Sequence, residues 1–269
     1  MCFLSGCRAV VGDRVLWSEA QGEGGKLSEV VERMTQLVRV DFKGRTQVLA
    51  ANLGGLLIVA TPSTPPFREG LLDRYLVAAY AADLEPVVCL NKVDLGVPDD
   101  VEQVLEAREA SGVRVVRVSA STGEGLEELA SQLAEWSAEA PWALVGHSGV
   151  GKTSLVRSLM PGQDVGEVGD LSSHWGTGQH TTTGSRLFDL PAGGCLVDSP
   201  GIRTFAPAGI ASADVRRLFP AVSELVCKYR GCRHRDGEEG CAGPEEVPTS
   251  LLASYRRLFY EMERLERRR

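Results

Sequence analysis

Residues 146–154, with the sequence GHSGVGKTS, constrain the fold of this chain more than any other stretch. They fit the phosphate-binding P-loop pattern, in which four residues separate a glycine from a Gly-Lys-Thr triplet. Glycines let the backbone turn tightly and bring its N–H groups up to phosphate oxygens. An apolar run at 142–145 precedes the loop, and a helix-like segment at 153–160 follows it and stops before Pro161. A strand, a glycine-rich loop and a helix N-terminus in this order predict a site for an anionic phosphate.

The loop also gives chemical roles to its side chains. Lys152 would supply positive charge to the β- and γ-phosphates, and the hydroxyl of Thr153 would reach a Mg²⁺ ion. The residues expected to contact a nucleotide in this stretch are Gly146, His147, Ser148, Gly149, Val150, Gly151, Lys152, Thr153 and Ser154.

Length and composition indicate a soluble globular protein of about two domains, or three small ones. The 269 residues are 43% hydrophobic and 24% charged, and the net charge of −7 argues against a protein that coats nucleic acid by charge alone. Seven cysteines without a secretory signal at the start do not indicate a disulfide framework. The longest apolar run, 56–60, is far too short to cross a bilayer. We therefore expect a cytoplasmic protein with no membrane partner.

The first 50 residues are β-rich. The stretch 10–17 alternates around a Gly-Asp turn, 46–50 is another short strand candidate, and a glycine-rich loop at 21–25 lies between them. A small barrel of the OB type, which often binds oligonucleotides, fits this pattern, and so does a simple β-meander. The basic residues Arg33, Arg39, Lys43 and Arg45 would contact RNA in the first case and stay solvated in the second.

From residue 53 the pattern changes to alternating strands and helices. Apolar runs at 56–60, 86–90 and 113–118 are typical of buried strands, and helical spacing occurs at 71–80, 101–110 and around 126–136. This alternation predicts a doubly wound parallel sheet whose ligands lie at the carboxyl ends of the strands.

Two of these strand ends carry residues suited to guanine. In Asn91-Lys92-Val93-Asp94, the Asp94 carboxylate can accept hydrogen bonds from the ring N–H and the amine of guanine, a pair that adenine does not offer. Asn91 would brace the loops, and the stem of Lys92 would cover the base. Ser119-Ala120 would bring a backbone N–H near the guanine carbonyl. Together with the P-loop, these patterns predict binding of GTP or GDP.

The segment after the P-loop helix supplies further phosphate and metal candidates. Thr182 is favoured over its neighbours as a Mg²⁺ ligand in the Gly- and Thr-rich stretch 176–183. Asp198 would hold Mg²⁺ through water, and the N–H of Gly201 would sense the γ-phosphate. Ile202 stands where a glutamine often orients the attacking water, so slow intrinsic turnover is expected.

Near the end of the chain, three cysteines and one histidine have the spacing of a metal site. Cys227, Cys232, His234 and Cys241 would close a tetrahedral Zn²⁺ site with no open position. Such a site is structural, and the metal would supply folding energy to a segment of low apolar content. The alternative is a loop with free thiols.

Basic and apolar residues surround this cluster. Lys228, Tyr229, Arg230, Arg233 and Arg235 would suit contact with an RNA backbone, or form a solvated face. A helical stripe then follows and is expected to pack on the protein; its members are Leu251, Tyr255, Leu258, Phe259, Met262 and Leu265.

The order of the motifs is permuted, because NKVD precedes the P-loop instead of following it. The set resembles the circularly permuted GTPases and, with its flanks, the family of ribosome small subunit-dependent GTPase A, RsgA. The features that carry this resemblance over nearly the whole chain are VVGDRV (10–15), DRYL (73–76), NKVDL (91–95), GHSGVGKTSL (146–155), QHTTT (179–183), DSPGIRTF (198–205) and the cysteine cluster.

The resemblance implies an OB-like domain at 1–50, a circularly permuted GTPase domain at 51–206 and a zinc-binding domain at 207–269. It implies a monomer that uses GTP or GDP with Mg²⁺ and one structural Zn²⁺. It also implies binding to the small ribosomal subunit and its rRNA, a role in late maturation of that subunit, and GTP hydrolysis stimulated by it. His180 is the catalytic candidate that the family suggests beside Lys152.

Two departures and two rival interpretations accompany this resemblance. The first 50 residues are short for the OB fold of the family, and the six-residue gap between His234 and Cys241 is one longer than expected. The rivals are a permuted GTPase that acts on the large subunit and a nucleotide-regulated RNA-binding module whose hydrolysis is incidental.

Overall fold

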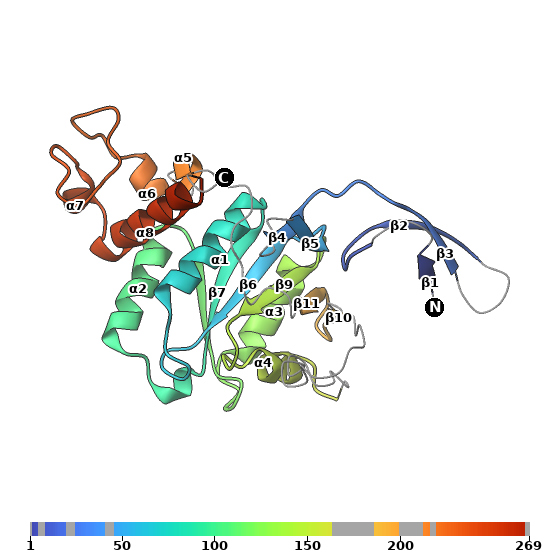
Figure 1. Ribbon diagram of the computed structural model, residues 1–269. Helices are drawn as coiled ribbons and strands as arrows, with labels where there is room; N and C mark the ends of the chain where they lie inside the picture. Colours follow the sequence, from blue (N-terminus) through green and yellow to red (C-terminus); the bar gives the residue numbers. More distant parts are fainter. Residues whose placement is uncertain are drawn as a thin grey trace, which may run out of the picture.

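A mixed six-stranded sheet forms the centre of the protein (Figure 1). The computed structural model describes residues 2–4, 9–19, 25–40, 46–162, 186–198, 212–215 and 219–266. The strand order is β10-β11-β9-β6-β7-β8, and every neighbouring pair is parallel except β10 with β11. The strands are β6 (Gly55–Ala60), β7 (Glu85–Asn91), β8 (Arg114–Val118), β9 (Trp142–Gly146), β10 (Arg186–Asp189) and β11 (Cys195–Asp198).

Helices cover both faces of this sheet, which confirms the predicted doubly wound arrangement. They are α1 (Glu69–Ala81), α2 (Asp99–Ala110), α3 (Leu126–Trp136) and α4 (Lys152–Leu159). Along β6, Leu56 and Ile58 pack in one apolar cluster with α1 and α2, whereas Leu57 and Val59 pack in a second cluster with α3 and α4. Because successive residues of a strand point to opposite faces, a strand covered on both sides must be apolar throughout.

The N-terminal segment forms two small sheets. One has the order β1-β3-β2, and the other pairs β4 with β5. The strands are β1 (Cys2–Leu4), β2 (Val15–Glu19), β3 (Gly25–Val30), β4 (Gln36–Val40) and β5 (Thr46–Ala51). The turn expected within 10–17 lies at Gly12, where φ is 86°; β2 begins after it at Val15, and Val11 before it makes an isolated bridge to Ala50. The pairings of the described residues do not close a barrel, so the OB-type fold stays a prediction.

The second of these small sheets packs on the central sheet. Leu37, Leu49 and Ala50 belong to the apolar cluster that contains Leu56 and Tyr75. The predicted boundary between residues 50 and 51 therefore falls inside β5, where the core is continuous.

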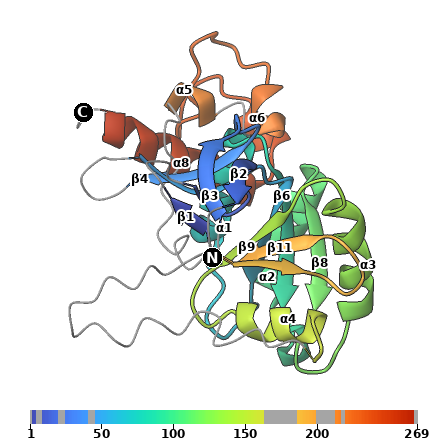
Figure 2. The same cartoon turned by 90° about the vertical axis from the view of Figure 1, so that its right-hand side faces the viewer.

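The C-terminal part is helical and packs against α1. Its helices are α5 (Ser212–Val215), α6 (Pro220–Ser223), α7 (Gly243–Glu246) and α8 (Thr249–Glu266). Tyr255, Leu258 and Phe259 of α8 share a buried cluster with Val77 of α1, so the predicted apolar stripe does pack on the protein. Two views related by 90° both place α8 above α4 and away from it (Figures 1 and 2). Among the described residues, no helix is both long and apolar enough to cross a membrane.

Candidate nucleotide site and metal cluster

The P-loop joins the end of β9 to the start of α4. Gly151 is the N-cap residue of α4 and has a φ of 91°, in the left-handed region. A Cβ added at Gly151 would lie 2.4 Å from Nδ2 of Asn91, and one at Gly146 would lie 2.4 Å from the carbonyl oxygen of Val59. Glycine is therefore required at both positions, because a side chain would push the loop away from its neighbours.

Lys152 is folded back over this loop. Its ammonium group donates hydrogen bonds to the carbonyl oxygens of Gly146, at 2.8 Å, and His147, at 2.9 Å. Thr153 follows in the first turn of α4. The loop therefore holds a lysine and a hydroxyl at a helix N-terminus, which is the arrangement that binds phosphate and its metal ion.

Asn91 braces the loops, as the sequence predicted. It is 1% exposed and donates from Nδ2 to the carbonyl oxygen of Val150 at 2.9 Å. Its Oδ1 accepts the backbone N–H of Ala120 at 3.0 Å. One side chain at the end of β7 thus joins the P-loop to the loop after β8. The N–H of Ala120 belongs to the pair that the sequence assigned to the guanine carbonyl, and in this structure Asn91 engages it.

Lys92 bridges two loops through its ammonium group. Its Nζ donates to the carbonyl oxygens of Thr64 and Gly149, each at 2.8 Å. The sequence predicted only that the stem of Lys92 covers a base, so these two bonds add a positioning role.

Asp94 is exposed in the 3₁₀ turn η1 (Val93–Leu95), where it can meet a base. Its Oδ1 accepts a hydrogen bond from Oγ of Ser119 at 2.6 Å. This bond lowers the pKa of Asp94 below its usual value, so the carboxylate is charged at neutral pH. Ser119 also accepts the N–H of Thr122 at 3.1 Å, which fixes its hydroxyl. The serine orients the aspartate, a role that the sequence reasoning missed.

Several predicted site residues lie outside the described residues. His180, Thr182 and Gly201 are among them. Asp198 ends β11 and pairs in register with Leu144 of β9, which sets its backbone at the same edge of the sheet. Its side chain is not described.

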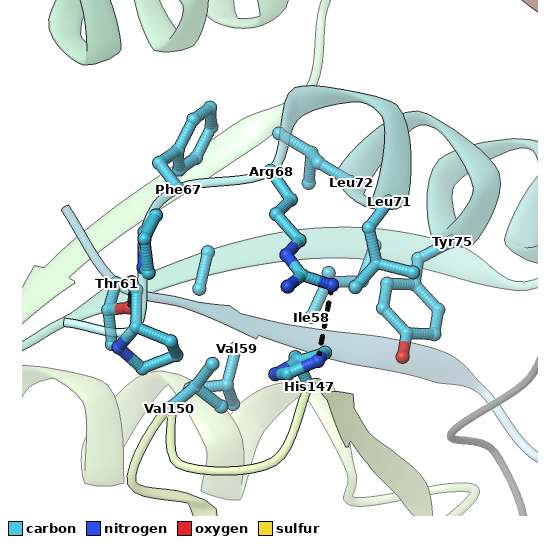
Figure 3. A pocket seen from close by; sticks show the side chains of 13 residues that line it. Ile58, Val59, Thr61, Phe67, Arg68, Leu71, Leu72, Tyr75, His147 and Val150 are labelled. Carbon is cyan, nitrogen blue, oxygen red and sulfur yellow. Dashed lines mark hydrogen bonds between the residues drawn. The ribbon is translucent and has the colours of Figure 1, made fainter. Parts of the chain in front are cut away.

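The loop between β6 and α1, residues 61–68, also borders the P-loop and was missed from the sequence. Nη1 of Arg68 lies 3.4 Å from Nε2 of His147 (Figure 3). Both residues line a cavity of about 30 Å³, together with Tyr75, whose burial raises its pKa to about 12. The signal was available, because this loop follows the carboxyl end of a parallel strand, where ligands collect.

The cysteine cluster is compact enough for one metal ion. The four ligand atoms of Cys227, Cys232, His234 and Cys241 all lie within 4.8 Å of one another. Nδ1 of His234 lies 3.5, 3.6 and 3.5 Å from the sulfurs of Cys227, Cys232 and Cys241. A tetrahedral zinc with usual bond lengths separates sulfur from nitrogen by about 3.6 Å. The residues therefore fit Zn²⁺ bound through Nδ1.

Helix α8 packs against this cluster. The ring of Tyr255 packs edge-on against His234 with centroids 5.6 Å apart. Nε of Arg256 donates to the carbonyl oxygen of His234 at 2.5 Å. Burial raises the pKa of Cys232 to about 12, so a bound cation is needed for the three sulfurs to be thiolates together.

Comparison with known proteins decides the family. Residues 30–207 match the family model described as RsgA GTPase, which covers more than half of the chain. The chain belongs to the RsgA GTPase family. It is therefore a GTP hydrolase, with the circularly permuted fold that the sequence predicted.

Relatives of this RsgA-family GTPase agree along most of its length. A protein of Azotobacter vinelandii named small ribosomal subunit biogenesis GTPase RsgA is 40% identical over 93% of this chain and 74% of its own. One of the same name from Pseudomonas syringae pv. tomato is 42% identical over the same shares. The crystal structure of YjeQ from Thermotoga maritima has a TM-score of 0.74 at 29% identity, covering 97% of this chain and 89% of its own. The circularly permuted GTPase YloQ has the same fold, with a TM-score of 0.69 at 24% identity over 98% of this chain and 86% of its own.

Several basic residues that the sequence suggested for RNA contact have partners within the chain. Arg33 donates to Asp13 at 2.7 and 2.9 Å, so its guanidinium is already engaged. Arg233 pairs with Glu263 at 2.7 Å, and the ammonium of Lys228 lies 5.4 Å from the ring of the half-exposed Tyr229. The side chains of Arg39, Lys43 and Arg45 are outside the described part of the chain.

Proposed function

We propose that this GTPase acts in late maturation of the small ribosomal subunit, and that the subunit stimulates its hydrolysis of GTP to GDP and phosphate. The shared name of relatives that are about 40% identical supports the pathway. The observation that carries the site is the double hydrogen bond of Asn91. It joins the loop after β7, the loop after β8 and the P-loop at one edge of the sheet.

The nucleotide would lie across these loops. The guanine would be recognised by the exposed carboxylate of Asp94, and the phosphates by backbone N–H groups of the P-loop and by Lys152. The residues assigned to GTP are Asn91, Lys92, Val93, Asp94, Ser119, Ala120, Gly146, His147, Ser148, Gly149, Val150, Gly151, Lys152, Thr153, Ser154 and Gly201. The division into an OB-like segment at 1–50, a GTPase domain at 51–206 and a zinc-binding domain at 207–269 is part of the same proposal.

Hydrolysis would follow the usual course for this class. A water attacks the γ-phosphorus, the bond to the bridging oxygen breaks, and Lys152 offsets the negative charge that develops. Thr153, Thr182 and Asp198 would hold Mg²⁺, which neutralises phosphate charge. His180 would orient or deprotonate the water, because Ile202 has no group that can do so.

The zinc would be structural. Four protein ligands leave no open position, so Zn²⁺ would fix the loop that Cys227 and Cys241 close and would not take part in the reaction. The exposed aromatic ring of Tyr229, which lies beside Lys228, supports contact between rRNA and the surface next to the zinc cluster. We further propose that the protein is a cytoplasmic monomer, and that the chain after Gly201 passes γ-phosphate sensing on to this domain.

The decisive experiment is GTP turnover with purified ribosomal subunits. We expect slow turnover alone, strong stimulation by small subunits and little by large ones. A Lys152→Ala protein should lose turnover in both conditions, because the charge on the phosphates is no longer offset. Stimulation only by large subunits would favour the first rival. No stimulation by any RNA would exclude the proposed role.

A further inference from the structure

A cluster of buried charges lies where α1 and α2 meet α8. Arg108 of α2 and Asp73 of α1 are each 1% exposed, and their Nη2 and Oδ1 atoms are 2.7 Å apart. The same nitrogen donates to Glu69 at 3.1 Å and to Oγ of Ser254 at 2.8 Å. Ser254 donates to Glu69 at 3.0 Å, and Arg257 of α8 donates to Asp73. We call these five residues the charge cluster.

The charge cluster permits only one register of α8. Removing an ion from water costs several kcal/mol, which is repaid only when its partners are in place. A shift of α8 by one turn, about 5.4 Å, would separate Arg257 from Asp73 and Ser254 from Arg108. The buried pair of Arg108 and Asp73 joins α2 to α1 and would remain, but both groups would lose their partners on α8, so the interface favours the docked register.

A second ion pair extends this interface toward the surface. Arg74 of α1 makes a two-pronged contact with Glu261 of α8, with nitrogen–oxygen distances of 2.9 and 3.3 Å. Their side chains are 40% and 29% exposed, so either can be changed without burying a charge. Helix α8 also carries Tyr255 and Arg256, which contact His234. The same helix therefore packs against both α1 and the zinc cluster.

The N-terminal end of α1, which carries Glu69 and Asp73 of the charge cluster, also contacts the P-loop. Arg68 is the residue before α1, and its guanidinium reaches Nε2 of His147 (Figure 3). Nδ1 of His147 lies 2.7 Å from the carbonyl oxygen of Ser148, so we assign the ring proton to Nδ1 and the acceptor role to Nε2. The adjacent residues Arg68 and Glu69 therefore bind in two directions, one to the P-loop and the other to the charge cluster.

The loop before α1 is held to the P-loop at a second point. Lys92 bridges the carbonyl oxygens of Thr64 and Gly149. Inside the loop, Oγ1 of Thr61 donates to the carbonyl oxygen of Pro65 at 2.8 Å, which stiffens it. A movement of α1 would therefore also move the P-loop, because these hydrogen bonds keep the loop at 61–68 from changing shape.

We propose that α1 is a mechanical link between the zinc-bearing C-terminal helices and the P-loop, and that Arg74 and Glu261 are positioning residues of this link. Force on the C-terminal part would act on α8, then on α1 through the charge cluster, and then on the P-loop through Arg68 and Lys92. The inference rests on the proposed function, because it gives the small subunit a route to the nucleotide. It is separate from the route through the chain after Gly201.

Charge reversal tests the link. Arg74→Glu and Glu261→Arg each place like charges side by side, whereas the double variant restores the pair in reverse. Each single variant should keep its intrinsic turnover and lose roughly threefold or more of the stimulation by small subunits. The double variant should recover it. Glu85→Arg is the matched control, because it breaks the exposed pair with Arg114, which lies 3.4 Å away and does not involve α8.

The outcomes separate this inference from the proposed function. Zinc content and thermal unfolding show that each variant is folded before turnover is compared. If the wild-type protein is stimulated and both single variants are stimulated equally, the link is wrong and the proposed function stands. A double variant that stays as weak as the singles would also overturn the link. If the wild-type protein is not stimulated by small subunits, both ideas fail.

Discussion

Replacing Gly151 by alanine should damage stability and nucleotide binding together. The φ of 91° puts a non-glycine residue in the left-handed region, which costs about 1–2 kcal/mol. The new Cβ would also lie 2.4 Å from Nδ2 of Asn91, which is buried and makes two hydrogen bonds. Moving that amide leaves buried polar groups unsatisfied at about 1–3 kcal/mol each. With one such group left unsatisfied, the expected total is about 2–5 kcal/mol.

Gly112→Ala isolates the backbone part of this effect. Gly112 has a φ of 88° and nothing within 4 Å of an added Cβ, so it carries the same strain without the clash. At about 2 °C per kcal/mol for a chain of this size, the midpoint temperature of thermal unfolding should fall by about 2–4 °C for Gly112→Ala and about 4–10 °C for Gly151→Ala. Titration with a fluorescent GDP should show at least about tenfold weaker binding for Gly151→Ala only. Equal losses in the two variants would refute the reasoning about Asn91.

Three further changes test other parts of the molecule. Asp94→Asn should weaken GTP binding about 10–100-fold and leave ATP binding unchanged, because hydrogen bonds to a charged group contribute about 1.5–3 kcal/mol. Since the pKa of Asp94 is lowered, the ratio of GTP affinities between wild type and Asp94→Asn should be the same at pH 5 and pH 8, and a ratio that shrinks toward pH 5 would contradict the assignment. Chelation, or Cys232→Ser, should remove one zinc per chain and expose residues 219–266 to proteolysis, whereas metal analysis that finds no zinc would exclude the site. Asp13→Asn should destabilise the N-terminal segment by about 3 kcal/mol, because Asp13 is 1% exposed and pairs with Arg33. Burial by itself raises the pKa of Asp13, but the hydrogen bonds from Arg33 and the Val10 N–H lower it by more, so its net pKa lies below the usual value. The stabilisation by Asp13 should therefore be present at neutral pH and be lost as the pH falls below about 4. Equal acid sensitivity of the wild type and the variant would count against it.

Features that depend on local pattern were predictable. Apolar runs of strand length alternate with helical spacing, and this alternation predicts a parallel sheet with its loops at one edge. Spacing alone also groups Cys227, Cys232, His234 and Cys241, because four soft or borderline ligands at short intervals are typical of a structural zinc site. In the N-terminal segment the pattern was weaker: the Gly-Asp turn within 10–17 was predictable, but the pairing of the strands around it was not. The glycines and the turn there are compatible with several pairings.

Pairings between distant residues were not predictable. Arg108 and Ser254 are 146 positions apart, and a lone arginine in a helix has the same pattern whether it is buried or solvated. Similarly, nothing in the sequence shows that Ser119 orients Asp94, because the sequence gives which residues follow the strands but not where their hydroxyls point. Nor does the sequence show that β5, which spans the predicted boundary after residue 50, places Leu49 and Ala50 in one apolar cluster with Leu56 and Tyr75.

The sequence by itself therefore determined the type of sheet, the edge at which the loops meet, and the residue types available for phosphate, guanine and zinc. Those properties follow from periodicity and from short spacings. Only the tertiary structure decided which loops Asn91 and Lys92 tie together and how α8 is fixed on α1. These contacts depend on the register in which separate elements pack, and that register is set by the whole core.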